Sequence, residues 1–361
     1  MEAVRACDRG HRLTMDLGIL SLSDLQTSLD TGRPGTAEQR IQDTVEYAVL
    51  AEQLGFDVFA LGEHHNLDFA VSSPAVVLAA IAARTDTIRL TSAVTVLSVL
   101  DPVRVYQDFA TLDLISAGRA EIIAGRSAFV EPFALFGAQL DDYDALFTEK
   151  IDLLLRLRAD DYVTWSGRFR PALDDAPISP RAHQQPLPVW AGVGGSPASA
   201  RRAGELGLPM VLGYIGGPLS HAKQAIDVYR AAGERAGHAD VLRVGISTHF
   251  FAGADPRSAR DVFPYYHEYL RPKRPGGRGF LVDRQAFEAG TRRGQAIMVG
   301  SSEEITEKIL DAYELLGIDR FFGQFDWGGL PRKLVEDSLH RYATEIAPVV
   351  REATGQRGLS T

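Results

Sequence analysis

The 361-residue sequence contains one cysteine, Cys7, so the chain can form neither an intrachain disulfide nor a cysteine-rich zinc site. No apolar run approaches the ~18 residues of a membrane-spanning helix, and residues 1–14 lack the apolar centre of a signal peptide. Positive charge is also scarce, because 38 Lys and Arg face 47 Asp and Glu, whereas a nucleic-acid-coating protein needs the opposite balance. Motifs of P-loop, nucleophile-elbow and zinc-protease type are missing. These absences predict a cytoplasmic protein with no metal site, no membrane association and no nucleic-acid partner.

The residues that are present have the composition of a globular protein, with 45% apolar and 24% charged residues. Short apolar runs alternate with stretches of helical period along most of the chain. Eight runs are predicted as strands, at residues 15–21, 57–65, 88–97, 120–129, 187–191, 209–214, 243–252 and 320–325. This alternation predicts an α/β fold, a parallel (β/α)8 TIM barrel. The competing architecture is a doubly wound open sheet, which would normally need a second domain; the sequence shows no linker to one.

Local signals mark several element boundaries. Thr36 and Ser73 are predicted N-caps, and Asp101 followed by Pro102 is predicted to open a helix. A hairpin is expected near residues 165–169.

The predicted domain organisation is simple. Residues 1–14 are expected to form a disordered N-terminal extension, and residues 15–355 a single barrel domain. An insertion after the seventh strand, at 264–295, contains the basic, Pro- and Gly-rich stretch 271–279. We interpret this insertion as a mobile lid over the site; the alternative is a surface loop whose basic residues serve solubility.

The second predicted strand ends in Glu63-His64-His65. Because side chains alternate across a strand, His64 shares a face with the small residues Val58, Ala60 and Gly62. Small residues facing the barrel axis would leave room for a flat ligand and would place His64 in the cavity. The two histidines should point apart, which argues against a metal site. The alternative is a pair of ordinary hydrogen-bonding histidines at a strand end.

Two further strand ends suggest an anion site. Arg126 follows Gly125 at the end of the fourth strand, where a guanidinium suits a phosphate, unless it forms a salt bridge to a neighbouring loop. The fifth strand leads into a glycine turn with Gly195, and Ser196 is placed as the N-cap of a helix that begins with Pro197. Such a turn is typical of a phosphate cradle, although many turns carry Gly and Ser for conformational reasons alone.

Taken in order, these segments resemble the bacterial luciferase-like family of flavin-dependent monooxygenases. The matching stretches are 63–65, 91–97, 101–104, 110–113, 116–119, 125–126, 133–137, 195–197, 208–210 and 299–301. The resemblance implies a barrel enzyme that uses reduced FMN as a co-substrate. With O2 it would oxidise a small organic substrate through a flavin C4a-peroxide. It also implies a homodimer, and the lack of a convincing NAD(P)H site implies a separate NAD(P)H-flavin reductase.

The resemblance assigns roles to individual positions. It makes His64 the catalytic acid–base histidine and places a non-prolyl cis peptide at Ala93-Val94, beneath the flavin ring. Phe129 matches an aromatic residue near the flavin. The residues implied in binding the cofactor phosphate, together with the glycine turn, are Arg126, Gly195, Ser196 and Ser199.

The sequence departs from the family pattern in two places. Gly125 stands where the luciferase catalytic subunit has a reactive cysteine, which argues against light emission but not against monooxygenation. Asp144 stands where a further phosphate-site arginine is expected. Three alternatives stay open: an F420-dependent hydride-transfer enzyme, a non-catalytic flavin-binding protein and a phosphate-sugar barrel enzyme.

Overall fold

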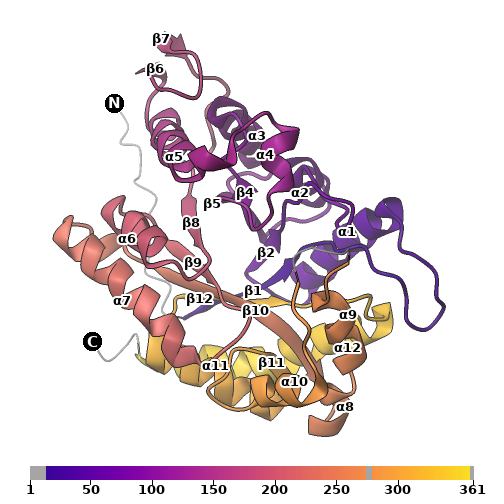
Figure 1. Ribbon diagram of the computed structural model, residues 1–361. Coiled ribbons are helices and arrows are strands. Elements are labelled where there is room, and N and C mark those ends of the chain that lie inside the picture. Colours follow the sequence, from indigo (N-terminus) through magenta and orange to yellow (C-terminus); the bar gives the residue numbers. More distant parts are fainter. Residues whose placement is uncertain (1–13, 274–278, 358–361) are drawn as a thin grey trace.

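The computed structural model describes residues 14–273 and 279–357. Within them, eight parallel strands close into a barrel, in which β12 and β10 complete the ring between β1 and β9 (Figure 1). In chain order these strands are β1 (Asp16–Ser21), β2 (Val58–Leu61), β3 (Arg89–Ser92), β5 (Ala120–Gly125), β8 (Val189–Val193), β9 (Met210–Gly213), β10 (Val244–Gly253) and β12 (Arg320–Gln324). The predicted (β/α)8 barrel is therefore confirmed. The predicted extension at 1–14 lies outside the described residues except for its last residue.

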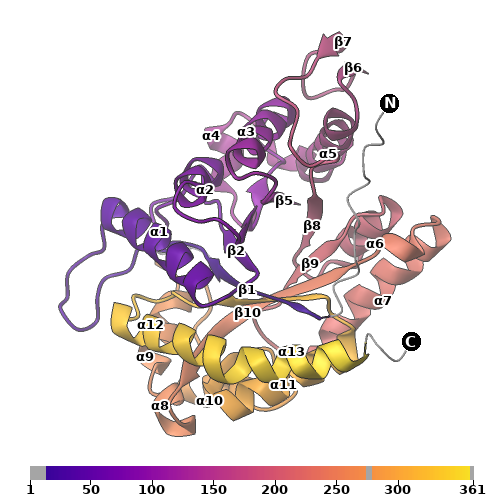
Figure 2. The same ribbon diagram turned by 180° about the vertical axis from the view of Figure 1, so that it is seen from behind.

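Helices connect the strands and cover the outside of the barrel (Figures 1 and 2). The main helices are α1 (Ala37–Gln53), α2 (Pro74–Ala82), α3 (Pro102–Ile115), α5 (Tyr143–Ala159), α6 (Pro197–Glu205), α7 (Leu219–Arg235), α11 (Ser302–Leu316), α12 (Arg332–Arg341) and α13 (Ala347–Arg357). A π-helical turn, Tyr342–Ile346, joins the last two. The side chains of Thr36 and Asp101 accept backbone N–H hydrogen bonds at the starts of α1 and α3, as predicted. Ser73 precedes α2, but its side chain makes no capping hydrogen bond in the described part of the chain.

Shorter elements fill the connections. They are β4 (Thr95–Val96), α4 (Glu131–Leu135), β6 (Tyr162–Trp165), β7 (Leu173–Pro177), α8 (Pro256–Arg260), α9 (Phe263–Leu270), α10 (Arg284–Thr291), β11 (Met298–Ser301) and the 3₁₀ turns Leu140–Asp142 and Ala239–Val241. Strands β6 and β7 form the predicted hairpin outside the barrel. The sequence did not predict β11, which pairs with the distal end of β10. The third predicted strand is interrupted after Ser92, and its continuation, β4, pairs with β5.

The insertion at 264–295 is largely helical where it is described. Its residues 274–278 lie outside the described residues, and α9 and α10 lie on either side of them. On α9, the Tyr269 hydroxyl accepts a 2.6 Å hydrogen bond from Gln324 Nε2, and the Tyr266 ring lies edge-on to Trp327 at 5.2 Å. Helix α9 therefore packs over the carboxyl end of β12. The lid function stays a prediction.

The buried apolar residues form separate inner and outer layers. Val58 and Ala60 belong to the inner cluster, in the barrel interior. Phe59 and Leu61, the intervening residues of the same strand, belong to the large cluster between barrel and helices. The side-chain alternation predicted for β2 is therefore confirmed, with small residues toward the barrel axis.

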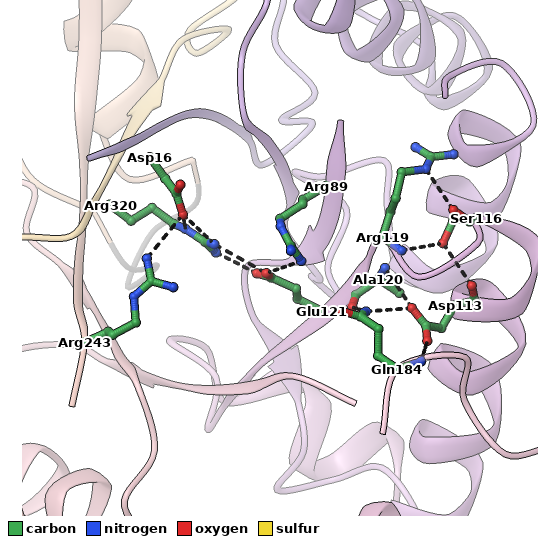
Figure 3. Close-up of polar contacts among 10 residues, drawn as sticks. All are labelled: Asp16, Arg89, Asp113, Ser116, Arg119, Ala120, Glu121, Gln184, Arg243 and Arg320. Carbon is green, nitrogen blue, oxygen red and sulfur yellow. Dashed lines mark hydrogen bonds and ion pairs between the residues drawn. The ribbon is translucent and has the colours of Figure 1, made fainter. Parts of the chain in front are cut away.

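A charge network closes the amino-terminal end of the barrel (Figure 3). Arg320, only 1% exposed, bridges Asp16 at 2.9 Å and Glu121 at 2.6 Å. Arg89 adds a 3.1 Å contact to Glu121, and Arg243 a 3.4 Å contact to Asp16. These residues lie at or near the first residues of their strands. Because the amino-terminal end is filled, the carboxyl ends of the strands are the place for a ligand.

Candidate active site

His64 lies just beyond the carboxyl end of β2, within an aromatic cluster. Its ring stacks on Phe69, with centroids 3.8 Å apart and an interplanar angle of 14°. The Phe129 ring meets it edge-on at 5.5 Å. His64 Nδ1 is buried and has no hydrogen-bond partner among the described residues. A buried nitrogen without a partner is available to a ligand, as expected for a site residue.

Burial controls the protonation of His64. Desolvation, with a smaller contribution from the neighbouring His65, lowers the pKa of His64 from 6.5 to about 3. The imidazole is therefore neutral near pH 7. A neutral ring has one nitrogen that can accept a proton and one that can donate a hydrogen bond.

The residues on either side of His64, Glu63 and His65, form structural hydrogen bonds. His65 Nε2 lies 2.7 Å from Glu63 Oε1, and Glu63 Oε2 accepts the Val96 backbone N–H at 3.1 Å. The buried Glu63 carboxylate thus ties the end of β2 to β4. The prediction that the two histidines point apart is confirmed, because their rings contact different aromatic side chains. The bridging role of Glu63 was missed, although its place on the outward face of β2 could have suggested it.

The peptide bond between Ala93 and Val94 is cis, at the position that the family resemblance implied. The Val94 side chain fills the space beside two glycines. A Cβ atom on Gly125 would overlap Val94 Cγ2, and one on Gly192 would lie 2.6 Å from Val94 Cγ1. Val94 therefore occupies the room that a cysteine at position 125 would need, and the absence of that cysteine has a steric reason.

A tight turn presents Phe129 to His64. Ser127 has a φ of 83°, a left-handed conformation that non-glycine residues rarely adopt. Its hydroxyl donates to the Phe129 carbonyl at 2.9 Å and accepts the Phe129 N–H at 3.0 Å. Local strain of this kind is found most often at functional sites, and here it positions an aromatic ring of the cluster.

The side chains of Arg126, which follows β5, and Ser199, on the helix α6 that follows β8, are in contact. Arg126 Nη2 donates to Ser199 Oγ at 2.6 Å, and its Nη1 forms an ion pair with Asp144. The guanidinium also lies 4.7 Å from the Tyr143 ring centroid. Two predicted phosphate-binding residues are thus adjacent. The alternative prediction was a salt bridge from Arg126 to a neighbouring loop; the structure has such a salt bridge, but its partner, Asp144, lies in the first turn of α5 and not in a loop.

The turn after β8 has open space at Gly195 and a Ser196 side chain that makes no capping hydrogen bond to the described chain. Gly195 has a φ of 89°, and a Cβ placed on it would meet no described atom within 4 Å. Ser196 precedes α6 as its N-cap residue, but its side chain makes no capping hydrogen bond to the described chain. A cavity of about 390 Å³ adjoins the turn, lined by Gly195, Leu212, Tyr214, His221, Ala222, Gln224 and Ala225. Free N–H groups and a hydroxyl at a helix start suit an anion.

The predicted residues therefore gather along one arc of the barrel rim, above the neighbouring strands β2, β3, β5 and β8. Sequence reasoning missed Phe69, which carries no spacing signal, and Arg202 on α6. Arg202 approaches Asp144 at 3.9 Å. The adjacent arginines Arg201 and Arg202 in the second half of α6 were a visible signal for it.

A second buried histidine lies on β10. His249 is 1% exposed, and its Nδ1 lies 2.9 Å from the Tyr266 hydroxyl, with the Tyr269 ring edge-on at 5.4 Å. Burial lowers the pKa of His249 from 6.5 to about 3.

His249 should make stability depend on pH. Between pH 6.5 and 3 the unfolded chain binds a proton on this imidazole and the folded chain does not, so the free energy of unfolding falls as the pH falls. The slope is about 1.4 kcal/mol per pH unit, or about 2 kcal/mol between pH 6.5 and 5. Urea unfolding at both pH values should show a smaller difference for His249→Gln than for the wild type. Equal differences would contradict the assignment.

Neither a metal site nor a membrane span is found in the described ranges. No group of three or more His, Cys, Asp or Glu side chains there could hold a metal ion. No helix in the same part of the chain is long and apolar enough to cross a bilayer.

Comparisons with known proteins agree with the barrel fold. The model of the luciferase-like monooxygenase family matches residues 15–320. The N-acetyl-S-alkylcysteine monooxygenase of Bacillus subtilis (strain 168) is 27% identical over 308 residues, covering 82% of this chain and 83% of its own. The alkanal monooxygenase alpha chain of the Kryptophanaron alfredi symbiont is 26% identical over 350 residues, covering 89% and 97%.

Two solved structures share the fold. The oxygenating constituent of 3,6-diketocamphane monooxygenase from Pseudomonas putida, in complex with FMN, has a TM-score of 0.73 at 20% identity and covers 93% of this chain and 98% of its own. An F420-dependent secondary alcohol dehydrogenase in complex with an F420-acetone adduct also has a TM-score of 0.73, at 18% identity, covering 94% and 99%. The family match over most of the chain decides the assignment: this protein is an oxidoreductase that belongs to the luciferase-like monooxygenase family.

Proposed function

We propose that the protein is an FMN-dependent monooxygenase that uses reduced FMN and O2 to oxidise a small organic substrate. The observation that carries the proposal is that two features lie on one arc of the rim. One is the neutral His64, whose Nδ1 has no hydrogen-bond partner in the described chain; the other is the anion cradle formed by Arg126 and Ser199. A ring-and-phosphate cofactor needs both features. The FMN-bound structural neighbour supports the choice of flavin.

The donor set fits FMN. Arg126 and Ser199 would hold the phosphate, with the open turn at Gly195 and Ser196 beside them. The Ala93-Val94 segment and Phe129 would contact the ring system. Reduced flavin, when bound, supplies the electrons that activate O2.

The chain's own residues would orient the cofactor and control protons and water. His64, neutral and stacked on Phe69, would accept or donate a proton beside the ring. The half-buried rings of Phe69 and Phe129 around it would limit access of water to the reacting atoms.

The partners are proposed with the function. Because the sequence shows no convincing NAD(P)H site, a separate NAD(P)H-flavin reductase in the cytoplasm would supply reduced FMN.

We also propose a homodimer through α2 and α3. Val76 on α2 is 69% exposed, and Leu114 and Ile115 on α3 are 49% and 53% exposed. A second copy of the chain could cover these apolar side chains.

Replacing Arg126 by Ala should weaken the binding of reduced FMN about tenfold or more, because the phosphate loses a charged hydrogen-bond donor. Riboflavin, which has no phosphate, should bind equally to both proteins. Anaerobic fluorescence titration measures both dissociation constants, and Arg201→Ala on the exposed side of α6 is the control. An unchanged dissociation constant for FMN would remove Arg126 from the site.

The second candidate is an F420-dependent hydride-transfer enzyme. It is favoured by the same anion cradle, since F420 also carries a phosphate, and by the F420-dependent structural neighbour. Anaerobic titration with reduced FMN and with F420 separates the two proposals. Tight binding of F420 with no binding of FMN would replace the first proposal by the second.

A further inference from the structure

Arg202 has an unsatisfied guanidinium next to the anion cradle. Its side chain is 23% exposed and lies over the Phe147 ring, with the guanidinium carbon 5.7 Å from the ring centroid. Nη2 lies 3.9 Å from Asp144 Oδ1, too far for a hydrogen bond. Nη1 is buried and lacks a hydrogen-bond partner anywhere in the described residues. A buried, unsatisfied guanidinium nitrogen indicates a missing acceptor.

The surroundings of Arg202 indicate that the missing acceptor is an anion. Arg126 and Arg202 both face one oxygen of the Asp144 carboxylate, and the Ser199 hydroxyl completes the group. Arg126, Ser199 and Arg202 line one hollow between α5 and α6 that has room for about one water molecule, so a larger anion has to take the place of the Asp144 carboxylate. Two positive charges thus share one negative charge. An anion with more charge and more oxygens than a carboxylate would satisfy them better, and phosphate is such an anion.

The Asp144 side chain is placed so that it can move away from Arg126 and Arg202 into the solvent. It lies in the first turn of α5, and its side chain is 72% exposed. An exposed carboxylate loses little when it returns to water, because exposed ion pairs contribute little to stability. It occupies the cradle as an internal anion.

We propose that Arg202 is a second phosphate-binding arginine and that the Asp144 carboxylate holds the phosphate's place until the cofactor binds. The inference rests on the proposed function, in that the phosphate is that of the cofactor. The inference also explains why Asp144 can stand where the family resemblance implies a phosphate-site arginine. Where the family resemblance implies an arginine on α5, this chain has an aspartate, and the second positive charge comes from α6 instead.

Titrations with reduced FMN and reduced riboflavin, under anaerobic conditions, test the proposal. Arg202→Leu keeps the apolar contact with Phe147 and should weaken FMN binding about tenfold, with riboflavin binding unchanged. Arg201→Leu, on the exposed side of the same helix, is the matched control and should alter neither. Asp144→Asn removes the competing charge at constant size and should tighten FMN binding several-fold.

The outcomes separate this proposal from the proposed function. If the wild type binds FMN and the ratio of riboflavin to FMN dissociation constants is the same in Arg202→Leu, the role of Arg202 is overturned while the function stands. Weaker FMN binding by Asp144→Asn would overturn the placeholder role of Asp144.

If the wild type binds no flavin, the proposed function fails, and inorganic phosphate then tests the cradle alone. Phosphate should raise the unfolding temperature of the wild type and Asp144→Asn more than that of Arg202→Leu. Equal shifts in all three proteins would overturn the proposal.

Discussion

Replacing His64 by Ala should lower the yield of oxidised product by about 10²–10⁴-fold, the usual contribution of a positioned acid–base group. The imidazole is held by stacking on Phe69 and by the edge of Phe129, and burial keeps it neutral, so it can accept a proton without first losing one. The measurement is product formed per reduced FMN consumed, with a substrate identified from a panel of small organic molecules. The fold should survive, since His64 lies beyond the end of β2 and its Nδ1 makes no hydrogen bond to the described chain.

A second variant separates the nitrogen atoms of His64 from its packing. His64→Phe retains the ring stack on Phe69 but has no nitrogen, so it should be as impaired as the alanine variant. Wild-type product yield in His64→Phe would show that His64 contributes only packing. Circular dichroism of both variants checks that the barrel is intact.

Replacing Arg320 by Met should destabilise the protein by about 3–5 kcal/mol, because two carboxylates would stay buried without their shared cation. Burial alone would raise the pKa of Glu121, but the charge and hydrogen bonds of Arg320 hold it below its usual range. Without Arg320, Glu121 and Asp16 keep only the partly exposed Arg89 and Arg243 as cationic partners, or they must take up protons. Urea unfolding at pH 7 measures the loss.

Two comparisons make the Arg320 prediction specific. Arg243→Met removes a 43% exposed cation from the edge of the same network and should cost less than about 1 kcal/mol. Adding Asp16→Asn and Glu121→Gln to Arg320→Met should recover part of the lost stability, since the uncompensated charges disappear. If Arg320→Met alone is as stable as the wild type, the network does not stabilise the barrel.

Much of the fold could be predicted from the sequence because its signals are local. The alternation of apolar residues in β2 predicted which face meets the barrel axis, and Val58 and Ala60 lie there. Asp101 before Pro102 predicted the start of α3, and Asp101 caps it. Strand and helix periods act over a few residues, so they can be recognised without knowing the tertiary contacts.

Other features depend on contacts that the sequence pattern does not show. The break in the third predicted strand accompanies a bend in which Val94 packs beside Gly125 and Gly192, two glycines from two other strands. Strand β11 exists because β10 extends beyond the barrel and offers it a partner. Neither feature has a periodic signal of its own.

The sequence by itself determined the barrel, the inward face of small residues on β2 and the presence of an arginine and a glycine turn at neighbouring strand ends. Only the tertiary structure decided how the charges at the rim are shared. The three charged residues come from different elements: Arg126 follows β5, Asp144 lies on α5 and Arg202 lies on α6. Their side chains meet because the barrel places the end of β5 and these two helices side by side. A charge interaction depends on distance in space, and residues this far apart along the chain acquire that distance only when the barrel closes.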